Sequence, residues 1–336
     1  MFITFFIKII IMQKIGNLKI DKGAFLAPMA DYTNIAFRTL CKEYGSAMQY
    51  TELTSAKAIT YDSKRTIEML VVSEKEKPVF LQLFGNDPVI IASAIKIVEK
   101  NFPKNFAGYD LNCGCSVPKA LKGKYGCYLM DHPILVGEII SAMKKVTKKP
   151  ITLKIRIGLT KETYLGVAKE AEEAGADAIC LHARSGNQGY GGASDWGAIK
   201  KLKQRVKIPV IANGDVNSVS DYEKIKKETD CDFVMVGRGA IGNAFLFKQI
   251  KNYENIKKVP EKNKKEILEE GMRFLELAKE FSLGVNSIKG YFIGLANGFN
   301  GAKKLRNKFA LAKTIKEMEK NLEDFFQSKD YKFKIT

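Results

Sequence analysis

The sequence predicts an α/β protein, a (β/α)8 TIM barrel followed by an all-helical C-terminal domain. Three observations predict this fold. Apolar runs of strand length occur eight times, amphipathic helical stretches alternate with them, and the strand-length runs stop near residue 247. Eight parallel β/α units in succession close a barrel. A doubly wound open sheet shows the same alternation and is the alternative, but it does not account for polar residues at so many strand ends.

The expected strands begin at residues 24, 47, 79, 109, 151, 178, 209 and 233. They read AFLAPMA, AMQYTEL, VFLQLF, YDLN, ITLKIRIG, AICLHAR, PVIAN and FVMVGRG. Helical patterns between them cover Pro88 to Lys100, Pro133 to Val146, Glu162 to Ala174 and Ser218 to Lys227. Polar or glycine residues follow most of the strands, and barrel active sites lie at that end.

Helices are expected over residues 264–282 and 303–326, beyond the last strand. The second expected helix has a single apolar face with spacings of three and four, formed by Leu305, Phe309, Ala312, Ile315, Met318, Leu322 and Phe325. The expected domains are a catalytic barrel over residues 12–247 and a helical domain over residues 248–336. Residues 1–11, MFITFFIKIII, are too short to span a membrane, and we expect them to be a translation-start artefact or disordered.

The chain carries a net charge of +18, which favours a polyanionic partner such as nucleic acid. A solvated surface in a lysine-rich protein is the alternative. Eight Lys or Arg against two Glu lie between Ser282 and Lys320, so the positive charge is locally concentrated. The six cysteines follow no regular framework, which predicts free thiols in a reducing compartment. We expect a cytoplasmic monomer that does not enter a membrane.

Two glycine turns, IANGD and VGRGAIGN, follow the seventh and eighth strands. Barrels commonly bind phosphate at this place, on backbone N–H groups. Gly214, Gly237 and Gly239 allow the backbone to approach a ligand closely, and Arg238 adds a charged donor. Two ordinary turns are the alternative, and the pairing on adjacent strands favours phosphate.

Several polar side chains are expected to meet at the barrel mouth. Lys154 lies inside an apolar strand, where an unpaired ammonium is costly, so it should face an anionic or hydrogen-bonding group. Gln82 and His182 stand at the ends of other strands. Each alone is equally consistent with a structural polar residue whose hydrogen bonds are satisfied, but their convergence on one face indicates a bound cofactor. Cys115 lies on the same face and is placed to reach a ligand, whereas Cys113 points away. Cys113, Cys115 and Cys127 do not have the spacing of a metal site, so no metal is expected.

Read together, these segments resemble the tRNA-dihydrouridine synthases, FMN-containing barrels with a helical RNA-binding domain. The resemblance covers the whole barrel in order. It rests on FLAPMADYTNIAFR (25–38), PVFLQLFGNDP (78–88), YDLNCGCSVPK (109–119), TLKIRIG (152–158), LHARSGNQGYGGASDW (181–196), IPVIANGD (208–215) and VMVGRGAIGNAFLF (234–247).

The resemblance implies reduction of the C5–C6 bond of uridines in tRNA, with FMN as cofactor and NADPH or NADH as electron donor. Cys115 would be the proton donor. The implied FMN site comprises Pro28, Met29, Ala30, Gln82, Lys154, His182, Asn213, Gly214, Asp215, Gly237 and Arg238. The implied tRNA-binding residues are Asn112, Arg184, Lys289, Lys303, Lys304 and Arg306.

This sequence departs from the family pattern at two places. Ser116 stands where the family usually has a proline after the catalytic cysteine, and Gly290-Tyr291 replaces a Lys-His pair in the helical domain. Two alternatives therefore stay open: an FMN-dependent barrel reductase of a small pyrimidine or enone, and an RNA-binding protein with weak or lost reductase activity.

Overall fold

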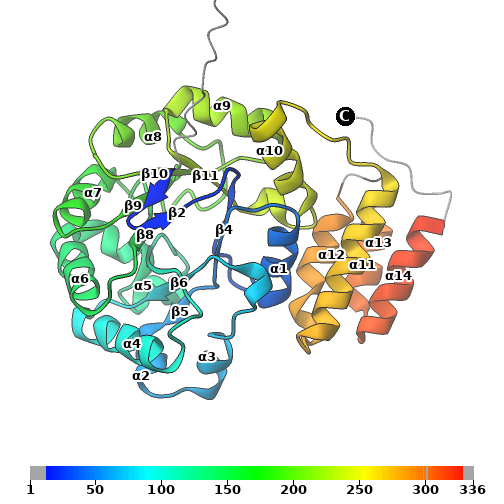
Figure 1. The fold of residues 1–336 in the computed structure, drawn as a ribbon, viewed down its shortest axis with the longest axis horizontal. Helices are drawn as coiled ribbons and strands as arrows, with labels where there is room; N and C mark the ends of the chain where they lie inside the picture. The colour runs from blue at the N-terminus through cyan, green and yellow to red at the C-terminus, as the bar shows by residue number, and fades with distance from the viewer. Residues whose placement is uncertain (1–12, 298, 300–301, 328–336) are drawn as a thin grey trace, which may run out of the picture.

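The computed structural model describes residues 13–297, 299 and 302–327. Eight parallel strands form a closed barrel (Figure 1). The last strand pairs with the first through Met235 and Phe25, which confirms the predicted barrel and excludes the open sheet. In barrel order the strands are β3 (Phe25–Leu26), β4 (Met48–Tyr50), β6 (Val79–Phe84), β7 (Gly108–Cys113), β8 (Ile151–Arg156), β9 (Ala178–His182), β10 (Val210–Asn213) and β11 (Phe233–Val236).

Helices surround the barrel: α1 (Ile35–Glu43), α4 (Pro88–Asn101), α6 (Pro133–Val146), α7 (Tyr164–Glu173), α8 (Trp196–Lys203), α9 (Val219–Thr229) and α10 (Phe245–Ile256). Their starts follow from local capping. Asp87 accepts hydrogen bonds from the first N–H groups of α4, and Ser218 does the same for α9. All four helices predicted from the pattern are present, with ends within a few residues of those expected. No described helix is long and apolar enough to cross a membrane.

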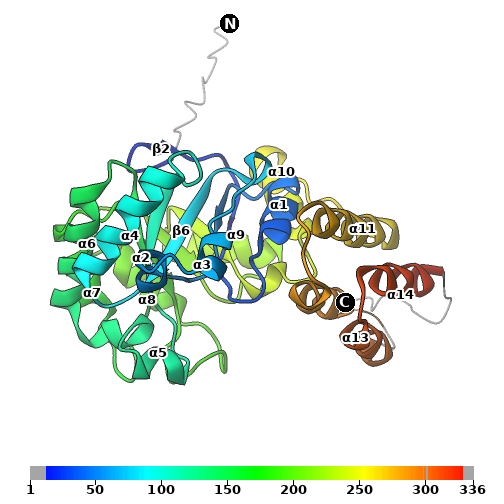
Figure 2. The same ribbon diagram turned by 90° about the horizontal axis from the view of Figure 1, so that it is seen from below.

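Short elements complete the barrel: β5 (Thr54–Ser55), α2 (Ala56–Thr60) and α3 (Lys64–Glu68) follow the second barrel strand, and α5 (Pro118–Lys122) follows the fourth. A hairpin of β1 (Lys14–Ile15) and β2 (Leu18–Lys19) comes before the first. Ile15 and Ile20 from this segment pack with the inward-facing side chains of the barrel. The hairpin therefore closes the end of the barrel opposite α5 (Figure 2).

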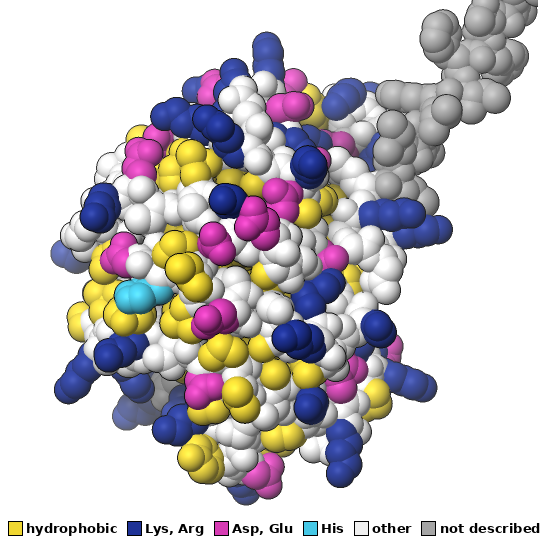
Figure 3. Space-filling model, turned by 90° about the vertical axis from the view of Figure 1, so that its left-hand side faces the viewer, with side chains coloured by type: hydrophobic (Ala, Val, Ile, Leu, Met, Phe, Trp, Pro, Cys, Tyr) yellow, Lys and Arg dark blue, Asp and Glu magenta, His cyan; other side chains and the backbone are white. Residues whose placement is uncertain are grey.

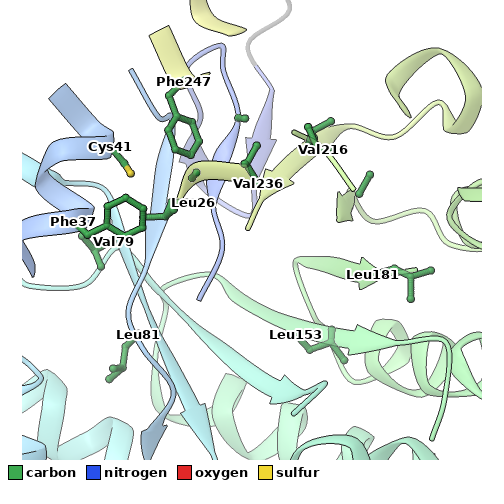
Figure 4. Packing of buried hydrophobic residues seen from close by; sticks show 14 of the residues in the cluster. Leu26, Phe37, Cys41, Val79, Leu81, Leu153, Leu181, Val216, Val236 and Phe247 are labelled. Carbon is green, nitrogen blue, oxygen red and sulfur yellow. The ribbon is translucent and has the colours of Figure 1, made fainter. Parts of the chain in front are cut away.

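Strand alternation divides the core into two parts. Outward side chains such as Leu81, Leu153 and Val236 pack against the helices (Figure 4). Inward side chains such as Phe25, Phe80 and Met235 fill the barrel. Since successive residues of a strand face opposite sides, this pattern determines which polar residues near the strand ends face the barrel mouth.

In the part of the chain that the structure describes, four α-helices follow the barrel: α11 (Lys264–Glu280), α12 (Lys289–Leu295), α13 (Ala302–Leu311) and α14 (Ile315–Gln327). The prediction of one helix over residues 303–326 is wrong, because the chain turns between α13 and α14. Thr314 Oγ1 accepts from the N–H of Glu317, and the Glu317 carboxylate accepts from the N–H of Lys313. This reciprocal cap starts a new helix. The expected domain boundary at residue 247 lies inside α10, which packs against α9 of the barrel.

Candidate active site

Two adjoining cavities open at the C-terminal ends of the strands. One lies against the turns after β10 and β11, and the other, of about 380 Å³, reaches Cys115 after β7. Both are lined by Pro28, Met29, Lys154, His182, Tyr190 and Arg238. The site is therefore one continuous depression at the barrel mouth, assembled from most of the residues that the sequence predicts.

The first cavity is bounded by backbone at two positions where only glycine fits. Gly214 has φ +126, and a Cβ there would lie 2.3 Å from the hydroxyl oxygen of Ser194. A Cβ on Gly239 would lie 2.4 Å from the carbonyl oxygen of Val216. Asn213, Asp215 and Gly237 complete this wall. The arrangement leaves room for a phosphate to approach the main chain.

Arg184, which was expected to contact tRNA, lines neither cavity and forms hydrogen bonds within the protein. It is 2% exposed, and it donates to both carboxylate oxygens of Asp215 at 2.7 Å. It also donates to Ser194 Oγ and to the carbonyl oxygens of Gly191 and Gly192. Arg184 thus holds the loop over residues 185–195 against the β10 turn. Burial would raise the pKa of Asp215, but Arg184 outweighs it and holds that pKa below its usual range.

Positive charge gathers around the two cavities. Burial lowers the pKa of Lys154, and its ammonium has no hydrogen bond or ion pair with any residue the structure describes. Burial also lowers the pKa of His182, and the charges of Lys154, Arg156, Arg184 and Arg238 add to the effect. His182 is therefore neutral. The charge of buried Asp110 acts on Lys154, but no carboxylate among the described residues forms an ion pair with the ammonium.

Cys115 and Cys113 face opposite sides of the barrel wall. Cys115 is half-buried and lines the second cavity, while Cys113 lies in the core between strands and helices. Cys127 N donates to the Cys115 carbonyl oxygen at 2.8 Å, an approach that requires glycine at position 126, where a Cβ would lie 2.4 Å from that oxygen. Burial raises the pKa of Cys113, and that of Cys127 to about 11. Among the described residues no group of three or more His, Cys, Asp or Glu could hold a metal.

Tyr190 is the main site residue that the sequence pattern does not predict. Tyr190 is 64% exposed and lines both cavities. The guanidinium of Arg238 lies 4.7 Å from the ring centroid and that of Arg156 lies 5.6 Å from it, so two cations lie close to the ring. The only available signal was an aromatic residue between glycines in a loop.

The basic residues of the helical region lie outside both cavities. Lys303 and Lys304 of α13 are exposed, and Arg306 donates to the Asn297 side chain at 2.9 Å. Lys289 is half-buried at the start of α12. α13 lies toward the same end of the barrel as α5, beside the mouth (Figure 2).

A sequence model of the family described as dihydrouridine synthase (Dus) matches residues 25–330. The chain belongs to the dihydrouridine synthase family. An Aquifex aeolicus protein named "Probable tRNA-dihydrouridine synthase" is 35% identical over 91% of this chain and 97% of its own length. The tRNA-dihydrouridine synthase B of Pseudomonas aeruginosa is 30% identical over 88% of this chain and 90% of its own.

Solved structures that resemble this chain share its fold at low sequence identity. A 2-naphthoyl-CoA reductase aligns with a TM-score of 0.56 at 13% identity, covering 71% of this chain and 51% of its own. An old yellow enzyme homologue from Zymomonas mobilis aligns with a TM-score of 0.55 at 10% identity, covering 76% of this chain and 94% of its own. These similarities extend to the barrel architecture alone.

Proposed function

We propose that this chain is a tRNA-dihydrouridine synthase, which reduces the C5–C6 double bond of uridines in tRNA with FMN and with NADPH or NADH as electron donor. The observation that carries the proposal is the half-buried Cys115 thiol, which lines the same cavity as the unpartnered Lys154 ammonium. Family membership and the names of the relatives support the same activity.

The residues present fit FMN. The turns at Asn213 to Asp215 and Gly237 to Gly239, with Arg238, would hold its phosphate. Pro28, Met29 and Ala30 would line the ring through their backbone, beside Gln82 and the neutral His182. Lys154 would receive the partner it lacks in the protein. When bound, FMN supplies the hydride that it takes from the electron donor.

Cys115 would donate the proton that C5 of the uracil receives. Its thiol lines the cavity from the loop after β7, so a pyrimidine bound above the mouth lies within its reach. Lys154 would stabilise negative charge that develops beside it in a partly dry site. Asn112, which lines the cavity beside Cys115, would orient the base.

A tRNA substrate is consistent with the charge of the chain. On the α6–α7 side of the barrel, Lys and Arg alternate with acidic and apolar side chains, as on an ordinary solvated surface (Figure 3). By contrast, α13 carries Lys303, Lys304, Arg306 and Lys308 and no acidic residue. The helical domain would hold tRNA phosphates, and the target uridine would turn out into the barrel mouth.

The experiment is to purify the protein, record its absorption spectrum and measure NADPH or NADH oxidation with unmodified tRNA and with free uridine. We expect flavin bands, and dihydrouridine formed in tRNA only. Turnover of free uridine at a similar rate would favour the small-molecule reductase. A flavin-free protein that binds tRNA would favour the RNA-binding role.

A further inference from the structure

A chain of buried polar side chains connected by hydrogen bonds lies beneath the second cavity, and its inner end, Asp110 and Thr152, has no part in the proposed catalytic steps. Asp110 is fully buried inside the barrel. Thr152 Oγ1 donates to one carboxylate oxygen of Asp110 at 2.6 Å, and Gln82 Nε2 donates to the other at 2.7 Å. Asn112 Nδ2 then donates to Gln82 Oε1 at 2.8 Å. These hydrogen bonds connect Asp110 to the cavity wall without interruption.

The chain ends on the loop that carries Cys115. Asn112 Oδ1 accepts from the backbone N–H of Cys115 at 3.1 Å and from that of Gly114 at 3.3 Å. Gln82 is fully buried and Asn112 is 7% exposed, so neither amide can exchange these bonds freely for water. Asp110 is thereby connected to the proton donor's loop through two amides.

The two ends of the chain determine how both amides are oriented. An ionised carboxylate only accepts hydrogen bonds, and a backbone N–H only donates them. Gln82 must therefore turn its NH2 group to Asp110 and its oxygen to Asn112. Asn112 must turn its NH2 group to Gln82 and its oxygen to the loop. Any reversal would place two donors or two acceptors together at a buried position.

We propose that Asp110 is a positioning residue that fixes this orientation and so determines which hydrogen-bonding group the cavity offers to the substrate. Both lone pairs of Asn112 Oδ1 are occupied, so Asn112 has only its second N–H left for a ligand. That N–H takes a carbonyl oxygen, which uracil has at C4, and not the amino group that cytosine has there. The role in recognition rests on the function proposed above; the fixed orientation does not.

The orientation can be tested by thermal unfolding of the full chain at saturating FMN, without measuring catalysis. Asn112→Asp places Gln82 between two carboxylates, where its oxygen must face one of them, and we expect a loss of roughly 2 to 6 °C in Tm. Asp110→Asn should restore most of this loss in the double variant. Gln82 can then turn over, accept from the amide at position 110 and donate to the carboxylate at position 112.

In Asn112→Asp, the new carboxylate and that of Asp110 also repel each other directly. A control without Gln82 separates this repulsion from the effect of the hydrogen bonds. In a Gln82→Met background the repulsion persists and the hydrogen-bonded chain does not. The coupling is the difference between the Tm change of the double variant and the sum of the Tm changes of Asp110→Asn and Asn112→Asp. We expect it to fall to less than half its size in the Gln82→Met background. Strictly additive single variants, or equal coupling in both backgrounds, would overturn the proposal.

Catalysis gives the second test. In Asp110→Asn the charge-assisted bond to Gln82 weakens, and we expect uridine reduction in tRNA to fall roughly tenfold with flavin reduction within twofold of the parent. Thr152→Val leaves the Asp110–Gln82 bond in place and should stay within threefold in both reactions. Unchanged uridine reduction in Asp110→Asn would overturn the recognition role. A parent protein that reduces no uridine in tRNA would overturn the proposed function, while the unfolding experiment would still report on the hydrogen-bonded chain.

Discussion

The proposed role of Cys115 as proton donor can be tested directly. Because the thiol lines the cavity and does not belong to the FMN site, Cys115→Ala should leave flavin reduction by NADPH or NADH nearly intact. Uridine reduction should fall by about two to four orders of magnitude, which is the usual contribution of a positioned proton donor. Separate stopped-flow measurements of the two half-reactions check this.

Cys113→Ala is the matched control, because the same atom is removed two residues away on the outer side of the barrel wall. It should lower stability through lost packing and leave both half-reactions within a few fold. Equal damage to uridine reduction by the two substitutions would remove Cys115 from the role of lone acid.

Asp110 also makes stability depend on pH. Burial raises its pKa from 3.8 to about 6 in the folded chain, despite its hydrogen bonds. Below pH 3.8 the group is protonated in both states; between 3.8 and 6 the unfolded chain ionises first, so stability falls as pH rises. Above pH 6 the titration of Asp110 lowers the free energy of unfolding by about 3 kcal/mol relative to its value at low pH.

Asp110→Asn removes this titration and should therefore gain stability relative to the parent as pH rises. We expect the difference in Tm between variant and parent to move in favour of the variant between pH 4.5 and pH 7.5. Thermal unfolding at both values checks it, with Thr152→Val as a variant that keeps the titrating group. A difference that does not change with pH would show that Asp110 titrates normally.

Most of the site could be predicted because it lies on strands. Lys154 and His182 follow the alternation of β8 and β9, which sends every second side chain into the mouth. Tyr190 belongs to the loop over residues 185–195, which has no periodicity, and Arg184 directly precedes this loop. Its direction depends on bonds between Arg184, Asp215 and Ser194, and sequence spacing does not reveal these contacts.

At the scale of elements, the helical region shows what an apolar pattern leaves open. Leu305 and Phe309 of α13 and Met318 and Leu322 of α14 are buried, as the spacing predicts. The same spacing cannot show where a helix is interrupted, because both helices keep the apolar face in phase. The sequence does contain a signal for the interruption. Thr314 is followed three residues later by Glu317, which is the spacing of a capping box at the start of a helix.

The basic face of α13 gives a prediction that separates tRNA binding from flavin chemistry. Replacing Lys303, Lys304 and Arg306 together with Gln should weaken tRNA binding. It should also reduce the slope of log affinity against log salt by up to roughly one unit for each lost phosphate contact. Flavin reduction should not change. Filter binding of one tRNA over a salt series measures the slope.

The matched control for this variant lies on the far side of the barrel (Figure 1). Lys200, Lys201 and Arg205, on and just after α8, are exposed and carry the same charge. Their replacement with Gln should leave the slope nearly unchanged. Equal slopes for the two triple variants would show that α13 is a solvated face and not part of the RNA-binding surface.

At the scale of the whole molecule, one buried carboxylate joins the barrel to the helical domain. Glu270 of α11 is fully buried and accepts from the backbone N–H groups of Ala244 and Phe245, at 2.7 and 3.3 Å, where α10 begins. Lys262 Nζ lies 2.7 Å from the same carboxylate, and the hydroxyl of Tyr291 in α12 donates to it. Burial raises the pKa of Tyr291, so the hydroxyl keeps its proton.

The replacement of the family's Lys-His pair by Gly290-Tyr291 gains a structural explanation from this junction. A Cβ on Gly290 would lie 2.6 Å from the ring of Tyr32, so only glycine lets α12 approach the barrel this closely. The Tyr291 ring packs against Phe37 of α1, with centroids 5.3 Å apart. The contacts join residues more than two hundred positions apart, which is why local patterns did not reveal them.

Glu270→Ala should therefore loosen the domain arrangement without touching the chemistry. It leaves the Lys262 ammonium and the start of α10 without their buried acceptor, for which we expect a loss of about 3 to 5 kcal/mol in unfolding free energy. Tyr291→Phe removes one donor and should cost about 1 to 2 kcal/mol. In both variants KM for tRNA should rise several-fold, and it should rise more in the variant that loses more unfolding free energy. The rate of flavin reduction should remain unchanged. A variant that loses stability and keeps the parent KM for tRNA would show that the helical domain binds RNA independently of how it is docked on the barrel.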